Sequence, residues 1–94
     1  MKLLFTRHAR KRILERGFRV DEVVSAAHAA STIVEAYPDD TPYPKRLVLG
    51  QAGSRPLHLV LAGPTPEGDT VLVTLYEPDL AKWEAGFTRR RPKP

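Results

Sequence analysis

The chain of 94 residues carries 15 Lys and Arg against 11 Asp and Glu, a net charge of +4, and contains no cysteine. This length predicts a single domain, and the absence of cysteine excludes disulfides and thiolate chemistry and favours a cytoplasmic location. No apolar stretch approaches the roughly 20 residues of a membrane-spanning helix, and Met1–Phe5 is too short for the apolar part of a signal peptide, so we expect no membrane association.

Two helices are predicted in the N-terminal third of the chain. Lys2–Phe5 is short and apolar, as at the start of a strand. Thr6 is a suitable N-cap because its hydroxyl can accept a backbone N–H of the first turn, and the helix that follows stops at Gly17. The second helix begins near Asp21, whose charge suits a helix N-terminus, and runs to about Ala30 with a face of small apolar residues.

From Ser31 onward the apolar period changes from helical to two, which predicts strands. Four strands are expected, at residues 31–37, 46–51, 56–62 and 70–76. The short turns between them predict an antiparallel meander. We therefore expect an α+β fold in one domain, residues 1–94, with two N-terminal helices packed on a four-stranded antiparallel sheet. A short helical turn at Leu80–Trp83 and a loose basic tail at residues 89–94 complete it.

Charge is segregated along the chain. Residues 1–19 carry seven Lys/Arg and one Glu, residues 45–64 carry three Lys/Arg, and residues 88–94 carry four, whereas residues 20–44 and 65–87 are acidic. Segregated basic blocks suit a polyanion, usually nucleic acid, although a solvated basic helix and a loose tail fit the pattern as well.

His8, Arg12 and Arg16 are spaced i, i+4, i+8 and therefore share one side of the first helix, beside the apolar stripe of Ala9 and Ile13. A neutral histidine in the first turn next to arginines suits proton transfer at a phosphodiester. The spacing alone favours a plainer interpretation, in which the histidine bonds a carbonyl and the arginines pair with acids.

The third and fourth strands place a histidine and a tyrosine together. Leu57, Leu59 and Leu61 form the face expected to meet the helices, so His58 lies on the opposite face, which Tyr76 can share. Such a pair can act as acid and base or as a stacking platform for nucleobases, or it can be an ordinary half-exposed pair.

The pattern of metal-ligand residues predicts no metal site. The three histidines lack metal-binding spacing, and Asp39–Asp40 fits ordinary turn chemistry. There is no Walker loop, dinucleotide fingerprint or nucleophile elbow. We therefore predict no metal and no cofactor.

Four stretches form a pattern along the chain, in the order FTRHARKRILERG, YPDDTPYPKRLVLG, RPLHLVLA and VTLYEPDLAKWE. Together they resemble the domain of unknown function 4258 family, a relative of the RelE and BrnT toxins, and the resemblance extends from Phe5 to about Arg91. It implies a fold of the barnase–EndoU–colicin–RelE type, in which many proteins are metal-independent ribonucleases, often toxins of toxin–antitoxin pairs. It places proposed active-site residues at His8 and Arg12, and its strand histidine and tyrosine at His58 and Tyr76.

The sequence thus predicts a metal-independent endoribonuclease, the toxin of a toxin–antitoxin pair that cleaves mRNA, free or on the ribosome. His8 and His58 are the expected acid and base, and Tyr76 stacks on a base or assists proton transfer. Arg12, with Lys45 or Arg46, is expected to stabilise the phosphorane. Further RNA contacts are expected at Arg16, Lys45, Arg46, Arg89, Arg90 and Arg91. The expected partners are RNA and an antitoxin protein. Two alternatives are a non-catalytic RNA- or ribosome-binding module and a protein-interaction domain that binds an acidic antitoxin.

Overall fold

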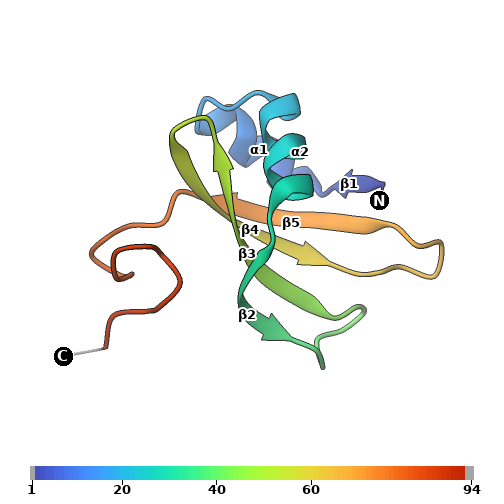
Figure 1. Cartoon of the computed structure of the whole chain (residues 1–94). Helices are drawn as coiled ribbons and strands as arrows, with labels where there is room; N and C mark the ends of the chain where they lie inside the picture. The colour runs from blue at the N-terminus through green and yellow to red at the C-terminus, as the bar shows by residue number, and fades with distance from the viewer. Residues whose placement is uncertain (1, 93–94) are drawn as a thin grey trace.

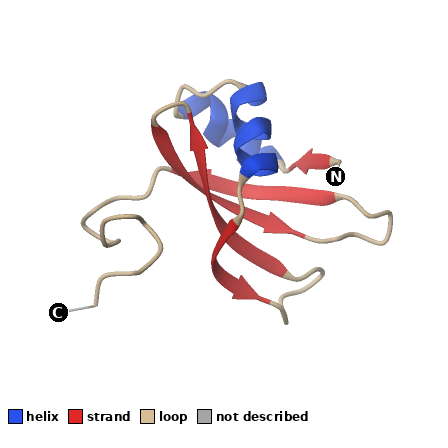
Figure 2. Cartoon of the chain, viewed as in Figure 1, coloured by secondary structure: helices blue, strands red, loops and turns tan. Residues whose placement is uncertain are grey.

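The computed structural model describes residues 2–92 and consists of two helices and one five-stranded mixed sheet (Figures 1 and 2). The elements are β1 (Leu3–Phe5), α1 (Arg7–Glu15), α2 (Val20–Ala29), β2 (Thr32–Tyr37), β3 (Lys45–Ala52), β4 (Arg55–Ala62) and β5 (Thr70–Tyr76). The predicted α+β class is confirmed, whereas a four-stranded antiparallel sheet is wrong. Within residues 2–92, neither helix has the length and apolarity needed to cross a membrane.

The fifth strand is β1, which lies at one edge of the sheet: the start of a strand expected at Lys2–Phe5 is confirmed, but the predicted four-stranded sheet did not include it. The strand order is β1-β5-β4-β3-β2, and β1 runs parallel to β5 with Leu3 opposite Thr70. The other four strands form the antiparallel meander that the short turns predict. Three residues are too few to show a period, so the pairing of β1 depends on contacts that only the folded chain creates.

Both ends of α1 form as their residues predict. The Thr6 hydroxyl accepts the Ala9 backbone N–H at 3.0 Å and donates to the Val73 carbonyl at 2.8 Å, so the N-cap also anchors the helix to β5. The helix ends at Glu15 with Arg16 as its C-cap, and Gly17 follows with a φ of +71°, in the left-handed region that glycine adopts without strain.

The helices cover one face of the sheet and form the core with it (Figure 2). Leu57, Leu59 and Leu61 of β4 are buried on this face, as predicted. α2 packs closely against β3, since a Cβ added at Gly50 of β3 would lie 3.0 Å from the Ala26 carbonyl oxygen. The small side chains of α2 permit this approach.

The opposite face of the sheet is partly covered by the segment that follows β5. The backbone N–H of Trp83 donates to the Asp79 carbonyl at 2.9 Å, which closes the single helical turn that the sequence predicts. The backbones of Trp83 and Arg90 then form an isolated antiparallel β-bridge, and the Arg91 N–H donates to the Lys82 carbonyl at 2.9 Å. The tail expected to be loose is therefore hydrogen-bonded as far as Arg91, and residues 93–94 lie outside the described part of the chain.

Candidate functional site

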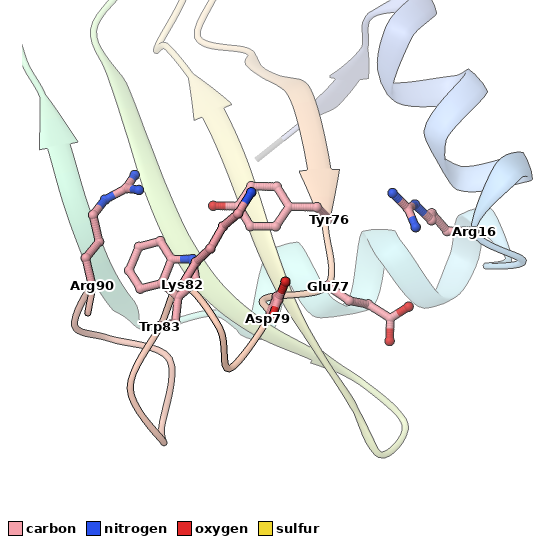
Figure 3. Close-up of a pocket in the computed structure, with 7 residues that line it drawn as sticks. All are labelled: Arg16, Tyr76, Glu77, Asp79, Lys82, Trp83 and Arg90. Atoms are coloured by element: carbon pink, nitrogen blue, oxygen red, sulfur yellow. The ribbon is translucent and has the colours of Figure 1, made fainter. Parts of the chain in front are cut away.

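A cavity of about 500 Å³ opens where β5 ends (Figure 3). It is bounded by the C-terminal end of α1, the end of β5 and the segment after β5. Its lining residues are Arg16, Tyr76, Glu77, Asp79, Lys82, Trp83 and Arg90. Cationic and carboxylate groups thus meet beside one tyrosine, and the partners of each charge decide what the cavity can bind.

The carboxylate of Glu77 is neutralised by Arg55 of β4. Arg55 Nη2 lies 2.6 Å from Glu77 Oε1, and Arg55 Nε donates to Oε2 at 3.2 Å. This guanidinium holds the pKa of Glu77 below its usual value. Arg55 Nη2 also donates to the Arg16 carbonyl at 2.9 Å and so ties the end of α1 to the cavity.

The Arg16 side chain points toward Tyr76 in Figure 3. Among residues 2–92, no carboxylate lies within 4.0 Å of its guanidinium, so its charge is available to an anionic ligand. Arginine is well suited to phosphate because its planar donors can form two parallel hydrogen bonds.

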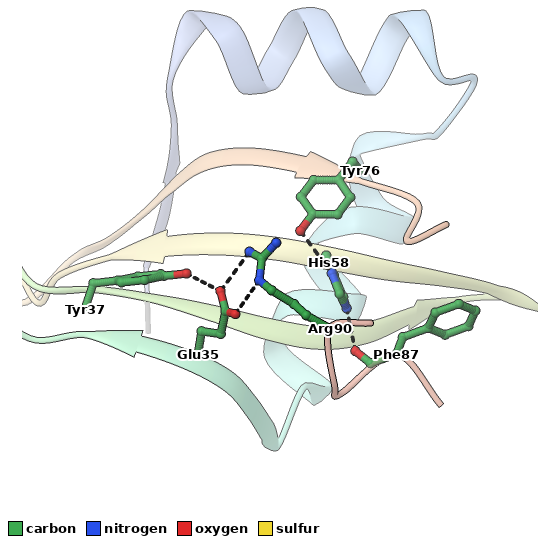
Figure 4. Close-up of polar contacts among 6 residues, drawn as sticks. All are labelled: Glu35, Tyr37, His58, Tyr76, Phe87 and Arg90. Carbon is green, nitrogen blue, oxygen red and sulfur yellow. Dashed lines mark hydrogen bonds and ion pairs between the residues drawn. The ribbon is translucent and has the colours of Figure 1, made fainter. Parts of the chain in front are cut away.

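Tyr76 is hydrogen-bonded to His58, its register partner on β4 (Figure 4). Tyr76 Oη lies 3.1 Å from His58 Nδ1, and the Phe87 carbonyl oxygen lies 2.8 Å from His58 Nε2. A carbonyl can only accept, so Nε2 carries the imidazole proton. Nδ1 therefore accepts the proton of the Tyr76 hydroxyl, an assignment made from the hydrogen-bond network.

His58 is fully buried between two aromatic rings. Its ring meets Trp83 edge-on at 4.4 Å between centroids and Tyr76 at 5.2 Å. Burial lowers the pKa of His58 and raises the pKa of Tyr76, so both are neutral at pH 7. The predicted sharing of a face by His58 and Tyr76 is confirmed, whereas half-exposure is wrong for His58 because Trp83 and Phe87 cover it.

Glu35 of β2 and Arg90 form a bidentate ion pair on the same face (Figure 4). Arg90 Nε donates to Glu35 Oε2 at 2.6 Å and Nη2 to Oε1 at 3.0 Å, while the Tyr37 hydroxyl donates to the same carboxylate. The Arg90 side chain holds the pKa of Glu35 below its usual value. Sequence reasoning missed Glu35, Trp83 and Phe87. For Glu35 the only available signal was one acid within an otherwise uncharged strand.

The predicted catalytic residues of α1 lie outside the cavity. His8 is exposed in the first turn and Arg12 is half-buried, and the cavity is lined instead by Arg16, the C-cap residue just past the end of α1. Eight residues of helix separate His8 from Arg16 by roughly 12 Å. His8 and His58 are therefore not brought together in this cavity.

The other predicted RNA contacts are dispersed. Lys45 Nζ lies 3.5 Å from Asp40 Oδ2, Arg89 is exposed, and Arg91 donates to the Leu80 carbonyl. Arg46 is the register partner of Leu61, so alternation places it on the helix-covered face, away from Tyr76. Arg16 and Arg90 alone of this group line the cavity.

Metal-ligand side chains are not clustered in the part of the chain that the structure describes. No three His, Asp or Glu side chains of residues 2–92 gather where they could hold one ion. The side chains of the cavity that can transfer a proton include Tyr76 and Lys82, and the buried His58 lies behind Tyr76 as its hydrogen-bond partner.

A family model described as a domain of unknown function (DUF4258) matches residues 5–77, which is most of the chain. The chain belongs to this family. The DUF4258 match includes Arg16, His58 and Tyr76 but ends at Glu77, before the segment that covers His58. Comparison with curated proteins and with solved structures found no match.

Proposed function

We propose that the chain is a metal-independent endoribonuclease whose active site is the cavity around Tyr76. One observation carries this proposal: Tyr76 lines the cavity while its hydroxyl donates to the unprotonated Nδ1 of a buried, neutral His58. A hydroxyl backed by a neutral imidazole can remove a proton from a substrate without itself becoming a free phenolate.

The proposed reaction begins at a ribose 2′-hydroxyl. The 2′-hydroxyl gives its proton to Tyr76 Oη as the Tyr76 proton moves to His58 Nδ1. The 2′-oxygen attacks the adjacent phosphorus, and the bond from phosphorus to the 5′-oxygen breaks, which leaves a 2′,3′-cyclic phosphate. The Lys82 ammonium supplies the proton that the leaving 5′-oxygen requires. The proton on His58 then returns through the Tyr76 hydroxyl to solvent, and solvent restores the proton of Lys82. General acid and base groups contribute on the order of 10²–10⁴-fold each.

Cations of the cavity would stabilise the added charge of the phosphorane. Arg16 has no carboxylate partner within residues 2–92 and points toward Tyr76, so it is the principal candidate (Figure 3). Preorganised donors of this kind act most strongly where charge develops in the transition state. Arg12 and His8 lie farther along the same side of α1, where they would contact the RNA backbone rather than the scissile bond.

The substrate and partner follow from the sequence motifs. We propose mRNA as the substrate and a toxin role with an antitoxin partner, supported by the resemblance to RelE and BrnT relatives. The basic block of residues 1–19, with seven Lys/Arg and one Glu, supports a polyanionic ligand.

The test is cleavage of RNA in EDTA by the wild-type protein and by Tyr76→Phe. Tyr76→Phe keeps the ring and removes the hydroxyl, so we expect cleavage to fall by about 10²-fold or more while RNA binding persists. Tyr43→Phe is the matched control, because Tyr43 does not line the cavity. The products should end in 2′,3′-cyclic phosphate and 5′-hydroxyl groups.

Two results would replace this function with another. Binding of RNA without cleavage by the wild type would indicate a non-catalytic RNA-binding module. Absence of both binding and cleavage would indicate a protein-interaction domain.

A further inference from the structure

Residues 78–91, here called the strap, lie beyond the family match at residues 5–77 yet supply two of the groups that contact His58. Trp83 of the strap is 3% exposed and packs edge-on against the imidazole, and the Phe87 carbonyl accepts the Nε2 proton. The environment of a histidine within the family domain is therefore set by a segment outside it.

The strap aims the Phe87 carbonyl through an unusual backbone conformation. Phe87 has a φ of +59°, which residues other than glycine rarely adopt, and it follows Gly86 at +91°. The Phe87 N–H donates to the Glu84 carbonyl at 2.9 Å, so a closed turn presents its carbonyl to His58. Unusual dihedral angles persist only where surrounding contacts enforce them.

One contact that holds this turn against the sheet is the ion pair between the strap and β2, here called the latch (Glu35 and Arg90). The Arg90 guanidinium donates two hydrogen bonds to the Glu35 carboxylate and lies 4.6 Å from the centre of the Trp83 ring. Trp83 and Arg90 also form a backbone bridge, so the turn that carries Phe87 is closed between them. The latch thus ties the Arg90 end of this turn to β2, and Arg90 contacts Trp83 at the other end.

We infer that the strap is a positioning element: the latch holds the Phe87 carbonyl on His58 Nε2 and so fixes the tautomer whose Nδ1 accepts the Tyr76 proton. This inference rests on the proposed function. If the carbonyl were withdrawn, the imidazole proton could move to Nδ1, where it would donate to Tyr76 Oη instead of accepting from it. His58 could then no longer take a proton from Tyr76. Glu35 and Arg90 are positioning residues, because they act through the strap.

The test uses the full chain, labelled with nitrogen-15, and the variants Glu35→Gln, Arg90→Gln and their combination. The imidazole nitrogen shifts of His58, identified by their loss in His58→Gln, report which nitrogen carries the proton. We expect a protonated Nε2 in the wild type, a mixture of tautomers in each variant, and a cleavage rate reduced about tenfold, a part of the 10²–10⁴ that a general base contributes. The cleavage rate of the double variant should be no lower than that of either single variant, because each single substitution already breaks the same ion pair.

Glu67→Gln is the matched control, since Glu67 is an exposed acid in the turn between β4 and β5. It should change neither the tautomer nor the cleavage rate. If Arg90→Gln does not fold, Tyr37→Phe removes only the tyrosine hydrogen bond to Glu35 and should shift the tautomer less, in the same direction.

The inference and the proposed function fail in different ways. An unchanged tautomer in Glu35→Gln and Arg90→Gln would overturn the inference, whatever the cleavage rate. A changed tautomer with unchanged cleavage would overturn the positioning role. A wild-type protein that cleaves no RNA would refute the proposed function, and with it the catalytic purpose of the strap, while the nitrogen shifts would still show whether the latch sets the tautomer.

Discussion

The guanidinium of Arg55 lies 3.7 Å from the centre of the Phe18 ring. From this position it also pairs with Glu77 and donates to the Arg16 carbonyl, so the start of β4, the end of α1 and the end of β5 meet at one side chain. This junction anchors the backbone of Arg16, whose side chain lines the cavity.

Replacement of Arg55 should disturb both stability and RNA binding. Arg55→Met keeps much of the contact with Phe18 but loses the ion pair with Glu77 and the hydrogen bond to the Arg16 carbonyl. We therefore expect a lower melting temperature and weaker RNA affinity. Arg19→Met is the control, because Arg19 pairs only with acids of its own helix start and its side chain is 76% exposed. Equal melting temperatures for the two variants would argue against the junction.

His58→Ala should cost stability on a scale close to that of a core leucine. Leu59→Ala should cost roughly 2–5 kcal/mol because a cavity remains. His58 is also fully buried and has two hydrogen-bond partners, so we expect roughly 2–4 kcal/mol, far more than its predicted half-exposure suggests. Urea denaturation measures both, with Leu14→Ala, 79% exposed, as the control. A cost below about 1 kcal/mol for His58→Ala would mean that the strap does not bury it.

Stability should fall as the pH drops below about 6.5, the ordinary pKa of histidine, because burial lowers the pKa of His58. Above that pH the folded and unfolded states both hold neutral His58. Below it the unfolded chain binds a proton that the folded chain does not, so the free energy of unfolding decreases by at most about 1.4 kcal/mol per pH unit. Urea denaturation between about pH 7.5 and about pH 5 should show this slope, and His58→Gln should reduce it. If His58→Gln leaves this slope unchanged, the pH dependence of stability comes from other titrating groups.

RNA affinity should weaken steeply with salt if the basic surface contacts phosphates. Five neutralised phosphates on single-stranded RNA imply a slope of about −3.5 in a plot of log affinity against log salt. Arg16→Gln should reduce the magnitude of the slope by about 0.7, the contribution of one phosphate. Fluorescence polarisation measures both slopes. A flat response would contradict a polyanionic ligand.

His8→Ala separates the role implied by the family motif from the one suggested by the cavity. His8 is exposed, so we expect an unchanged melting temperature. Because His8 does not line the cavity, we also expect cleavage to persist with somewhat weaker RNA binding. Complete loss of cleavage at an unchanged melting temperature would instead show that the catalytic centre lies on α1, as the motif implies.

Local patterns in the sequence determined the parts of this structure that depend on neighbouring residues. Thr6 caps α1 and Gly17 ends it because capping and left-handed dihedral angles are properties of a few consecutive residues. Strand alternation likewise places His58 on the face opposite Leu57 and Leu59, since side chains of a strand point to opposite faces in turn. That Tyr76 lies on the same face also requires the register of β5 against β4.

The tertiary structure alone decided how the site is enclosed. Glu35 and Arg90 are 55 positions apart, and Phe87 and His58 are 29 apart, so no local period connects them. Their contacts exist because the chain after β5 folds back across the sheet, which also buries His58 and settles its tautomer. The parallel pairing of β1 with β5 arises in the same way, because a three-residue strand gains its hydrogen bonds only where the rest of the fold presents an open edge.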